Sequence, residues 1–273
     1  MHEICAEHNA HDATRNPEPA LNEVRARQIR ERDLTGRRGL FVAEGAVVLN
    51  VLASPQSRCR AVSALIAEQR VETLRPVLEN LDAPVYAAGQ AVIDAVAGFP
   101  IHRGILALGE KPAEPELSAL LNAAPDDALV VAVCGVGNHD NMGGIFRNAA
   151  AFGAHGVLLD THCCDPLYRK AIRVSVGAAL RTPFVTGGAP LAMLDALEAA
   201  GFSLLALSPS GGERLSDVRP GGRAALILGA EGPGLTPAVM ARCRTVGIPM
   251  AGGCDSLNVA ATSAVALHQM RFG

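Results

Sequence analysis

Between residues 21 and 109, apolar runs of strand length alternate with stretches of helical periodicity. Helices are expected at 45–54 and 71–81. The expected strands are 39–44, 61–67, 83–88 and 104–109. This alternation predicts a small α/β domain over 21–109. Residues 110–117 carry two prolines and alternating charge, which is typical of a linker between domains.

The residues after the linker predict a second α/β domain, 118–273. Residues 128–135 form a continuous apolar run, which is typical of a strand buried on both faces of a parallel sheet. Further strands are expected at 156–160, 202–208, 224–229 and 245–249. Helices are expected at about 142–152, 166–179, 190–200 and 256–270. The alternation predicts a mainly parallel sheet with helices on both faces.

The composition is that of a globular protein. Of the 273 residues, 49% are hydrophobic and 19% are charged, and the chain is long enough for two domains. The polar residues 1–20 are expected to form a mobile tail. No apolar run is long enough to span a bilayer, and no segment near the N-terminus has the pattern of a signal peptide, so no membrane contact is expected.

The seven cysteines are irregularly spaced and include no CxxC pair. This usage indicates reduced thiols and therefore a cytoplasmic protein. The adjacent pair Cys163–Cys164 leaves a redox or metal role open beside that of ordinary buried or loop thiols. No spacing of histidines or cysteines predicts a metal site, and none is expected.

The basic residues are nearly all arginine, and they gather in two places although the net charge is −3. Six arginines lie between residues 25 and 38; those proposed to bind RNA are Arg25, Arg27, Arg30, Arg37 and Arg38. The second stretch, which holds no acid from 166 to 181, carries Arg169, Lys170, Arg173 and Arg181. The planar guanidinium group binds two phosphate oxygens at once, so both stretches are candidate phosphate-binding surfaces. The alternative is that both are ordinary solvated faces.

Common nucleotide-binding and hydrolase motifs are absent or incomplete. Residues 135–140 follow a predicted strand and open a helix, but Asp140 occupies the third glycine position of a dinucleotide-binding loop. No phosphate-binding loop and no HExxH motif is present, and Arg173 stands where a nucleophile elbow around Ser175 would need glycine. These features disfavour a dehydrogenase, kinase, lipase or zinc protease.

Three segments combine glycines with isolated polar residues: 138–154, 226–237 and 248–270. Each follows a predicted strand, at the edge of the sheet where ligands bind in α/β folds, and the glycines let the backbone approach a ligand closely. In order and spacing the segments resemble the three signature motifs of the SpoU (TrmH-like) family of SPOUT RNA ribose 2′-O-methyltransferases. Residues 34–49 and 100–109 resemble the start and the end of that family's substrate-binding domain.

The resemblance implies methyl transfer from S-adenosylmethionine to a ribose 2′-hydroxyl of structured ribosomal or transfer RNA. It implies a SPOUT-type parallel sheet with a C-terminal trefoil knot, a smaller N-terminal α/β domain and a homodimer. The implied catalytic residues are Arg147, Asn141, Glu231, Ser256 and Asn258. The implied methyl-donor site comprises Ser208, Pro209, Leu228, Gly229, Glu231, Gly232, Gly234, Ile248, Met250 and Leu257.

Each of these roles has a purely structural alternative. Arg147 could be a surface residue, and Asn141 and Ser256 could cap helices. Glu231 could be a general base or a buried, hydrogen-bonded carboxylate that shapes its loop. Arginine is a poor base because its pKa exceeds about 12, so Arg147 is expected to hold a phosphate or to stabilise a developing alkoxide.

One dipeptide departs from the family pattern. His139–Asp140 stands where the family commonly has Asp-Pro, beside the expected substrate loop, so the sequence leaves the target RNA open. The alternative function is an RNA-binding protein that keeps the fold and has lost methyltransferase activity. Small residues at the start of the last predicted helix would permit close helix packing in a dimer; they are Ala260, Ala261, Ser263 and Ala264.

Overall fold

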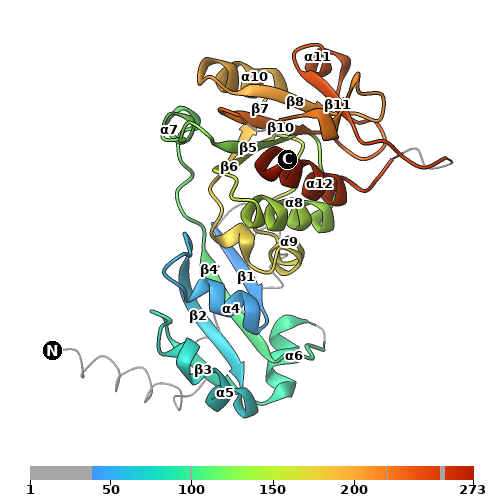
Figure 1. The fold of residues 1–273 in the computed structure, drawn as a ribbon. Coiled ribbons are helices and arrows are strands. Elements are labelled where there is room, and N and C mark those ends of the chain that lie inside the picture. Colours follow the sequence, from blue (N-terminus) through green and yellow to red (C-terminus); the bar gives the residue numbers. More distant parts are fainter. Residues whose placement is uncertain (1–38, 99, 220, 253–255) are drawn as a thin grey trace. The chain divides into compact units, whose positions relative to one another are not determined.

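The computed structural model describes residues 39–98, 100–219, 221–252 and 256–273. These residues divide into two compact units, which are described separately (Figure 1). The first unit comprises 39–112 together with Leu167–Arg181. The second comprises Ala113–Pro166 and Thr182–Gly273. The sequence-based division assigned 167–181 to the second domain, whereas in the structure this segment packs with the first unit.

The first unit contains a four-stranded sheet in the order β1-β4-β2-β3. Its strands are β1 (Leu40–Glu44), β2 (Arg60–Ala67), β3 (Val85–Ala88) and β4 (Ile105–Glu110). Strand β4 runs antiparallel to β1 and β2, and β3 is parallel to β2. Gly109 makes room for the fully buried ring of Phe41, because a Cβ atom at Gly109 would lie 2.3 Å from the Phe41 Cζ atom.

The helices of the first unit are α4 (Ala46–Leu52), α5 (Glu68–Leu78) and α6 (Gln90–Ala97). The segment Leu167–Arg181 adds α9 (Arg169–Val174), which packs against β1, and the 3-10 turn η1 (Ala178–Leu180). The backbone of Arg58 donates to the Leu180 carbonyl oxygen at 2.9 Å, which ties η1 to this unit. The segment is therefore held by both helix packing and backbone hydrogen bonding.

The second unit contains a seven-stranded sheet in the order β7-β6-β5-β10-β8-β11-β9, in which all neighbouring strands are parallel. The strands are β5 (Leu129–Val133), β6 (Gly156–Asp160), β7 (Phe184–Gly188), β8 (Ser203–Leu207), β9 (Glu213–Arg214), β10 (Ala224–Leu228) and β11 (Arg244–Gly247). Strands β5, β6 and β10 are buried at every residue, as expected for apolar strands covered on both faces.

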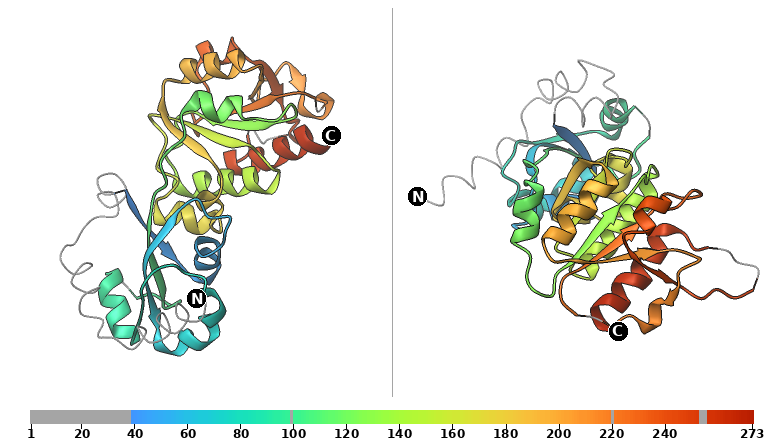
Figure 2. Two further views of the ribbon diagram at one scale, coloured as in Figure 1. Left: turned by 90° about the vertical axis from the view of Figure 1, so that its left-hand side faces the viewer. Right: turned by 90° about the horizontal axis from the view of Figure 1, so that it is seen from above.

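Helices cover both faces of this sheet (Figures 1 and 2). On one face α7 (Leu117–Asn122), α10 (Pro190–Ala199) and α11 (Pro237–Met240) share a core with the strands. On the other face α8 (His139–Ala151) packs against β6, and α12 (Val259–Phe272) packs against β10 and α8. A 3-10 turn, η2 (Leu215–Asp217), contacts α12.

The predicted α/β class and the mainly parallel sheet agree with this architecture. Five helices and strands were not predicted: α6, α7, α11, β7 and the two-residue strand β9. Helix α7 begins at Leu117, where the linker was predicted to end, and α11 is a single turn started by Thr236 and Pro237. Among the described residues, no helix is both long and apolar enough to cross a membrane.

Candidate active site

The three segments singled out by sequence meet at one edge of the second unit's sheet. Strands β5, β10, β8 and β11 are consecutive neighbours and parallel, so the loops that follow them leave from the same edge. Helix α8 follows β5, the loop 229–236 follows β10, and the loop that leads to α12 follows β11. The edge therefore collects the polar residues of all three segments.

Asn258, in the third segment, contacts the other two segments through its side-chain amide. Its Nδ2 atom donates to the Asn141 Oδ1 atom at 2.8 Å and to the Glu231 Oε1 atom at 3.1 Å. Its Oδ1 atom accepts from the backbone N–H groups of Ala260 and Ala261 at 2.9 and 3.3 Å. This last pair fixes the orientation of the amide, because only an oxygen can accept from backbone N–H groups. Asn258 thus uses both of its N–H donors to hold a residue of the first segment and a residue of the second.

Asn141 has donor capacity left over. The residue is 4% exposed, and its Oδ1 atom is occupied by Asn258. Its Nδ2 atom is buried and has no hydrogen-bond partner among the described residues. A buried donor without a partner costs free energy, so such a group is commonly explained by a ligand, an ion or water that binds there.

The structure corrects two of the helix caps considered from sequence. Helix α8 is capped by Asn138, whose side chain accepts from the N–H groups of Asp140 and Asn141 at 2.8 and 3.4 Å. Helix α12 is capped by Asn258 and begins at Val259. Asn141 therefore lies inside the first turn, and Ser256 precedes the cap by two residues and is exposed. The cap signal of Asn138, an Asn directly after an apolar strand, was present in the sequence.

Glu231 is exposed, not buried as one of the two sequence interpretations proposed. It keeps the predicted hydrogen bond, since its Oε1 atom accepts from Asn258. The loop that carries it is tight: Gly232 and Gly234 have φ values of 84° and 67°, and the Gly234 N–H group donates to the Ala230 carbonyl at 3.1 Å. The loop geometry, rather than burial, holds the carboxylate in place.

Arg147 lies on the exposed side of α8, two turns after the cap. No described residue forms a hydrogen bond or an ion pair with its guanidinium group, so the structure does not bring it into the Asn141–Asn258–Glu231 network. Helical side chains lean toward the helix N-terminus, and the turn before Arg147 contains Gly143 and Gly144. The path of the arginine back toward the start of α8 is therefore free of bulky side chains on its own helix.

The close approach of α8 and α12 depends on small residues and one asparagine. A Cβ atom at Gly144 would lie 2.6 Å from the Ala260 Cβ atom, so any larger residue would push the helices apart. Asn148 donates from Nδ2 to the Ala260 carbonyl at 2.7 Å and to the Ser263 hydroxyl at 2.9 Å. Sequence reasoning missed Asn148, because a single amide on a helix carries no local signal of a tertiary role.

The predicted donor-site residues lie in loops where backbone meets backbone. A Cβ atom at Gly229 would lie 2.6 Å from both the carbonyl carbon of Gly234 and the nitrogen of Leu235. The Ser208 N–H group donates to the Val246 carbonyl at 3.0 Å, which joins the loop after β8 to the end of β11. Leu228 is buried in the sheet, Ile248 and Met250 are half-buried, and Pro209 and Leu257 are exposed.

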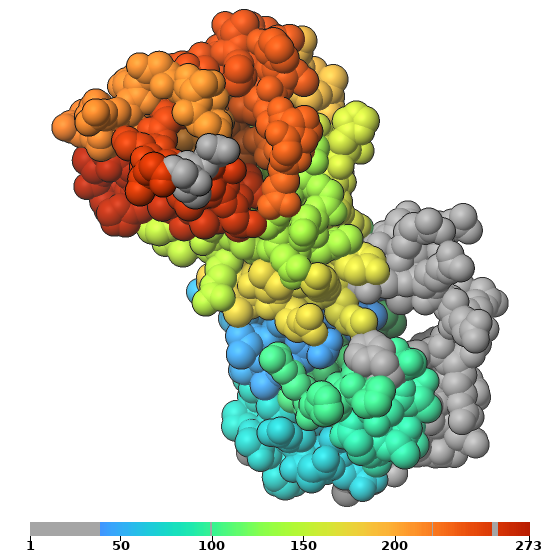
Figure 3. Space-filling model, turned by 90° about the vertical axis from the view of Figure 1, so that its right-hand side faces the viewer, coloured from blue at the N-terminus to red at the C-terminus, as the bar shows by residue number. Residues whose placement is uncertain are grey.

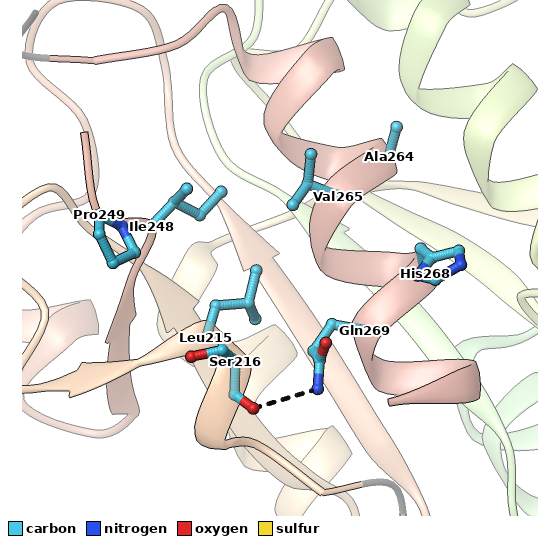
Figure 4. A pocket seen from close by; sticks show the side chains of 8 residues that line it. All are labelled: Leu215, Ser216, Ile248, Pro249, Ala264, Val265, His268 and Gln269. Atoms are coloured by element: carbon cyan, nitrogen blue, oxygen red, sulfur yellow. Dashed lines mark hydrogen bonds between the residues drawn. The ribbon is translucent and has the colours of Figure 1, made fainter. Parts of the chain in front are cut away.

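A groove of about 550 Å³ runs along α12 (Figure 4). Ile248 and Pro249 face Val265 across it, and Leu215 and Ser216 lie beside Gln269, whose Nε2 atom donates to the Ser216 carbonyl at 3.4 Å. Its remaining lining residues are Ala264 and His268. Of the residues predicted for the donor site, Ile248 alone lines this groove.

Burial favours the neutral thiol at four of the described cysteines. Burial raises the pKa of the Cys134 and Cys163 thiols to about 12 and those of Cys164 and Cys243 to about 11. The Cys163 thiol donates to the Val133 carbonyl oxygen at 3.3 Å. Within the described residues no group of three His, Cys, Asp or Glu side chains could hold a metal ion.

The residues predicted to bind RNA fall partly outside the described structure. Arg25, Arg27, Arg30, Arg37 and Arg38 lie outside the described residues. Arg169, Lys170 and Arg173 lie on α9 of the first unit, where Lys170 and Arg173 are exposed and Arg169 is half-buried.

Structures with this fold are known among RNA methyltransferases. The SpoU methyltransferase AviRb from Streptomyces viridochromogenes, solved in complex with the cofactor AdoMet, superposes with a TM-score of 0.78 at 26% sequence identity, covering 92% of this chain and 96% of that one. An uncharacterized tRNA/rRNA methyltransferase of Mycobacterium bovis is 36% identical over 277 residues, which cover 97% of this chain and 94% of the relative. A 23S rRNA (guanosine-2′-O-)-methyltransferase RlmB of a Burkholderia species is 29% identical over 204 residues, 74% of this chain and 83% of the relative.

These similarities define the class: the protein is an RNA methyltransferase. The sequence model of the SpoU rRNA Methylase family matches residues 128–268. This range includes the sheet edge with Asn141, Arg147, Glu231 and Asn258. The chain belongs to the SpoU rRNA methylase family.

Proposed function

We propose that the protein transfers a methyl group from S-adenosylmethionine to a ribose 2′-hydroxyl of structured RNA, either ribosomal or transfer RNA. The observation that carries this proposal is the Asn141 Nδ2 donor, buried and without a described partner inside a network that joins the three family segments. The Burkholderia relative is a guanosine 2′-O-methyltransferase, which supports the ribose hydroxyl as acceptor.

The loops after β8, β10 and β11 would hold the methyl donor. Gly211 and Gly229 lie where a Cβ atom would come within 2.6 Å of neighbouring backbone, so these loops pack backbone against backbone and are shaped by their peptide groups. Peptide N–H and C=O groups can read an adenine edge, and Ile248 and Met250 supply apolar surface beside them. When bound, S-adenosylmethionine supplies an activated methyl group on a sulfonium, which calls for alignment with the acceptor oxygen.

The polar residues divide the work of positioning and binding. Asn258 is a positioning residue. Its Nδ2 atom spends both N–H donors on Asn141 and Glu231, and its Oδ1 atom caps the start of α12. Asn141 presents its remaining N–H groups to an acceptor atom of the bound RNA or donor. Glu231 orients the loop 229–234, and its second carboxylate oxygen remains available to a hydroxyl group.

Arg147 would bind the nucleotide that is methylated. Arginine keeps its proton throughout the accessible pH range, so it cannot remove the hydroxyl proton as a free base. Its guanidinium group would instead hold the adjoining phosphate and stabilise the negative charge that develops on the 2′-oxygen. Ser256, exposed two residues before the cap of α12, is proposed to contact the same nucleotide.

We propose that the protein is a homodimer that associates through the outer face of α12. This face is apolar: Val265 is 46% exposed, Phe272 is 67% exposed, and Ala261 is exposed between them and Leu257. The dark red end of the chain contributes to the surface of the second unit in Figure 3. A helix face with exposed large apolar residues beside a groove commonly marks a contact with another protein surface.

We also propose, from the family resemblance, that the carboxyl-terminal part is threaded as a trefoil knot. The crowding of Gly211 against Val246 and of Gly229 against Gly234 supports tightly packed loops of the kind that a knot needs. Pulling the two ends of residues 118–273 apart in a single-molecule instrument is the test. A knotted chain reaches a shorter contour length than 156 free residues allow, and full extension would refute the knot.

The proposed reaction is tested with purified protein, S-adenosylmethionine and RNA from cells that lack the protein. Mapping of 2′-O-methyl groups by mass spectrometry should reveal one or a few modified ribose positions that are absent from the untreated RNA. Methylation of a base instead of a ribose would overturn the 2′-hydroxyl assignment. RNA binding without binding of S-adenosylmethionine by calorimetry would favour the alternative, a binding protein that has lost activity.

A further inference from the structure

Two arginines distant in sequence lie beside the dipeptide Glu44–Gly45 in the first unit. Glu44 ends β1 and is 8% exposed. Its Oε2 atom is buried, has no hydrogen-bond partner among the described residues, and lies 3.9 Å from the Nη1 atom of Arg173 on α9. The carboxylate and the guanidinium group therefore attract each other by charge without forming a hydrogen bond.

This geometry leaves the Arg173 guanidinium group free to bind a ligand. Its side chain is 46% exposed, and no described residue accepts a hydrogen bond from it. A guanidinium group carries five N–H donors, and at 3.9 Å none of them is consumed by Glu44. A salt bridge with a purely structural role would be expected to close to hydrogen-bonding distance, as the pair Arg60–Glu110 does at 2.6 Å in the same unit.

Arg103 lies against the next residue, Gly45. The Arg103 Nη1 atom is 3.1 Å from the position that a Cβ atom at Gly45 would occupy, so a side chain there would displace the arginine. Gly45 also has a φ of 90°, which favours glycine independently. Arg103 is exposed, and no described residue forms a hydrogen bond or ion pair with it.

The loop that carries Arg103 is held from α6. The Ile101 N–H group donates to the Asp94 Oδ1 atom at 2.8 Å, and the Gln90 Nε2 atom donates to the Ile101 carbonyl at 2.7 Å. The backbone hydrogen bond from Ile101 and the side-chain hydrogen bond from Gln90 lower the pKa of the Asp94 carboxyl. After Arg103 the chain is fixed again, since the Ala67 N–H group donates to the Gly104 carbonyl at 2.8 Å. The arginine is thus presented by an ordered loop.

We propose that Arg103 and Arg173 together bind one phosphodiester group of the RNA substrate, and that Glu44 positions Arg173 for it. One guanidinium group lies beside the Glu44 carboxylate and the other against Gly45, so two positive charges face a single negative one and keep unused planar N–H donors, the chemistry that suits a phosphate. The inference rests on the proposed function, because it assigns a contact to the RNA of that reaction. The contact belongs to the first unit and is separate from the network around Asn141.

The test measures the salt dependence of RNA binding by the full chain, with a fluorescently labelled RNA hairpin of mixed sequence as probe. Arg103→Ala and Arg173→Ala should each weaken binding about tenfold at low salt. In the double variant, the slope of log affinity against log salt should fall by about 0.7–0.9, the value for one phosphate, because both arginines share it. A loss of about twice that slope would show two independent contacts and overturn the shared site.

The matched control is Arg70→Ala, which removes the same charge from the exposed surface of α5 in the same unit. Arg70 has no described partner and lies outside the proposed site, so its loss should change the affinity less than the loss of Arg103. If Arg103→Ala and Arg70→Ala behave alike, the arginines act only as general surface charge, and the proposed site is wrong.

Glu44→Gln separates positioning from net charge. The substitution removes a negative charge, so simple electrostatics predicts tighter RNA binding. If Glu44 positions Arg173, binding should instead weaken, and in an Arg173→Ala background the same substitution should no longer weaken it. Thermal unfolding of each variant checks the fold; tighter binding by a folded Glu44→Gln protein would overturn the positioning role.

Failure of this inference is distinguishable from failure of the proposed function. Wild-type protein that neither binds the hairpin nor methylates RNA would refute the proposed function itself. Wild-type protein that methylates RNA, with Arg103→Ala and Arg173→Ala binding the hairpin as tightly as wild type, would refute only the phosphate site at Glu44–Gly45.

Discussion

Helices α8 and α12 pack against each other and begin in the same way. Each is capped by an asparagine, Asn138 or Asn258, whose Oδ1 atom accepts from the second and third N–H groups of its helix. The Asn258 amide also donates to Asn141 and Glu231, whereas the Asn138 amide donates to no comparable pair of side chains within the described residues. The same kind of cap thus only starts helix α8, whereas in α12 it also links the helix to the candidate site.

The difference indicates a division of labour between the two helices. Helix α8 carries the groups with unused hydrogen-bonding capacity, Asn141 and Arg147. Helix α12 carries the residue that holds the network together and, on its outer side, the exposed apolar face with Val265 and Phe272. We therefore expect substitutions on α8 to affect chemistry directly, and substitutions on α12 to affect it through positioning or assembly.

The largest effect on turnover is expected from Arg147→Ala on α8. Removing an aligned group that stabilises developing charge should lower the methylation rate on bound RNA by about 10²-fold or more. Affinity for S-adenosylmethionine should change little, because the donor loops follow β8, β10 and β11. Single-turnover rates at saturating RNA, with calorimetry of donor binding, give both quantities. Near-normal turnover would remove Arg147 from the site.

A pair of cap substitutions tests the comparison itself. Asn138→Asp and Asn258→Asp both retain an oxygen that can cap the helix, so both should preserve stability to within about 1 kcal/mol. Only the change at position 258 removes the donors to Asn141 and Glu231 and places a second carboxylate beside Glu231. We expect the methylation rate of Asn258→Asp to fall about tenfold or more, the worth of a lost hydrogen bond to a charged group. Equal rates for the two variants would show that Asn258 is only a cap.

The pH profile sharpens this test. Two carboxylates at hydrogen-bonding distance repel each other when both are ionised, which raises the pKa of the pair. The defect of Asn258→Asp should therefore be smaller at low pH, where one carboxyl group is protonated and can donate a hydrogen bond, and larger at neutral pH. A defect independent of pH would point to local distortion of the loop.

A third prediction contrasts the two sides of α12. Gly144→Ala adds a methyl group 2.6 Å from the Ala260 Cβ atom on the inner side, so it should destabilise the folded chain by about 1–3 kcal/mol. Ala261→Leu adds bulk on the exposed outer side, so it should leave the stability of the single chain nearly unchanged and weaken the proposed dimer.

Sedimentation and denaturant unfolding at several protein concentrations separate these outcomes. The Ala261→Leu protein should dissociate at higher concentration than wild type and lose activity in step with dissociation. A fully active, folded monomer would refute the coupling between assembly and activity. An inactive protein that remains dimeric would place the damage in the nearby site instead.

The sequence predicted the strands of the sheet better than it predicted which unit each connecting segment packs on. Continuous apolar runs such as 156–160 predicted β6 with its observed bounds, because a strand buried on both faces leaves a local signal. The association of Leu167–Arg181 with the first unit was missed, since its helix and turn look the same whichever unit they pack on. Local periodicity reports an element, whereas its partner is decided by tertiary contacts.

The candidate site shows the same limit. Family resemblance identified Asn141, Glu231 and Asn258, and the structure brings their side chains into one network. The resemblance could not indicate that Asn258 caps α12, or that Glu231 is exposed. The cap depends on where the helix starts, and the exposure depends on how the loop folds. The proposed phosphate site was visible only in part: the sequence pointed to Arg173, but Arg103 and Arg173 meet the dipeptide Glu44–Gly45 only through the fold.

The smallest effect on turnover is expected from Cys163, whose thiol contacts the end of β5, the strand that leads into α8. Cys163 donates to the Val133 carbonyl at the end of β5, and burial raises its pKa to about 12 from 9.0. Because the folded-state pKa is raised, the thiol contributes stability that is fully present below pH 9 and is lost as pH rises from about 9 toward 12. Cys163→Ser keeps a donor of similar shape, so turnover should remain at the wild-type level. The difference in unfolding free energy between Cys163→Ser and wild type should be constant below pH 9 and shift in favour of the serine variant above it. A shift that began near neutral pH would mean that the thiol ionises easily, and would make it a reactive group beside the start of α8 after all.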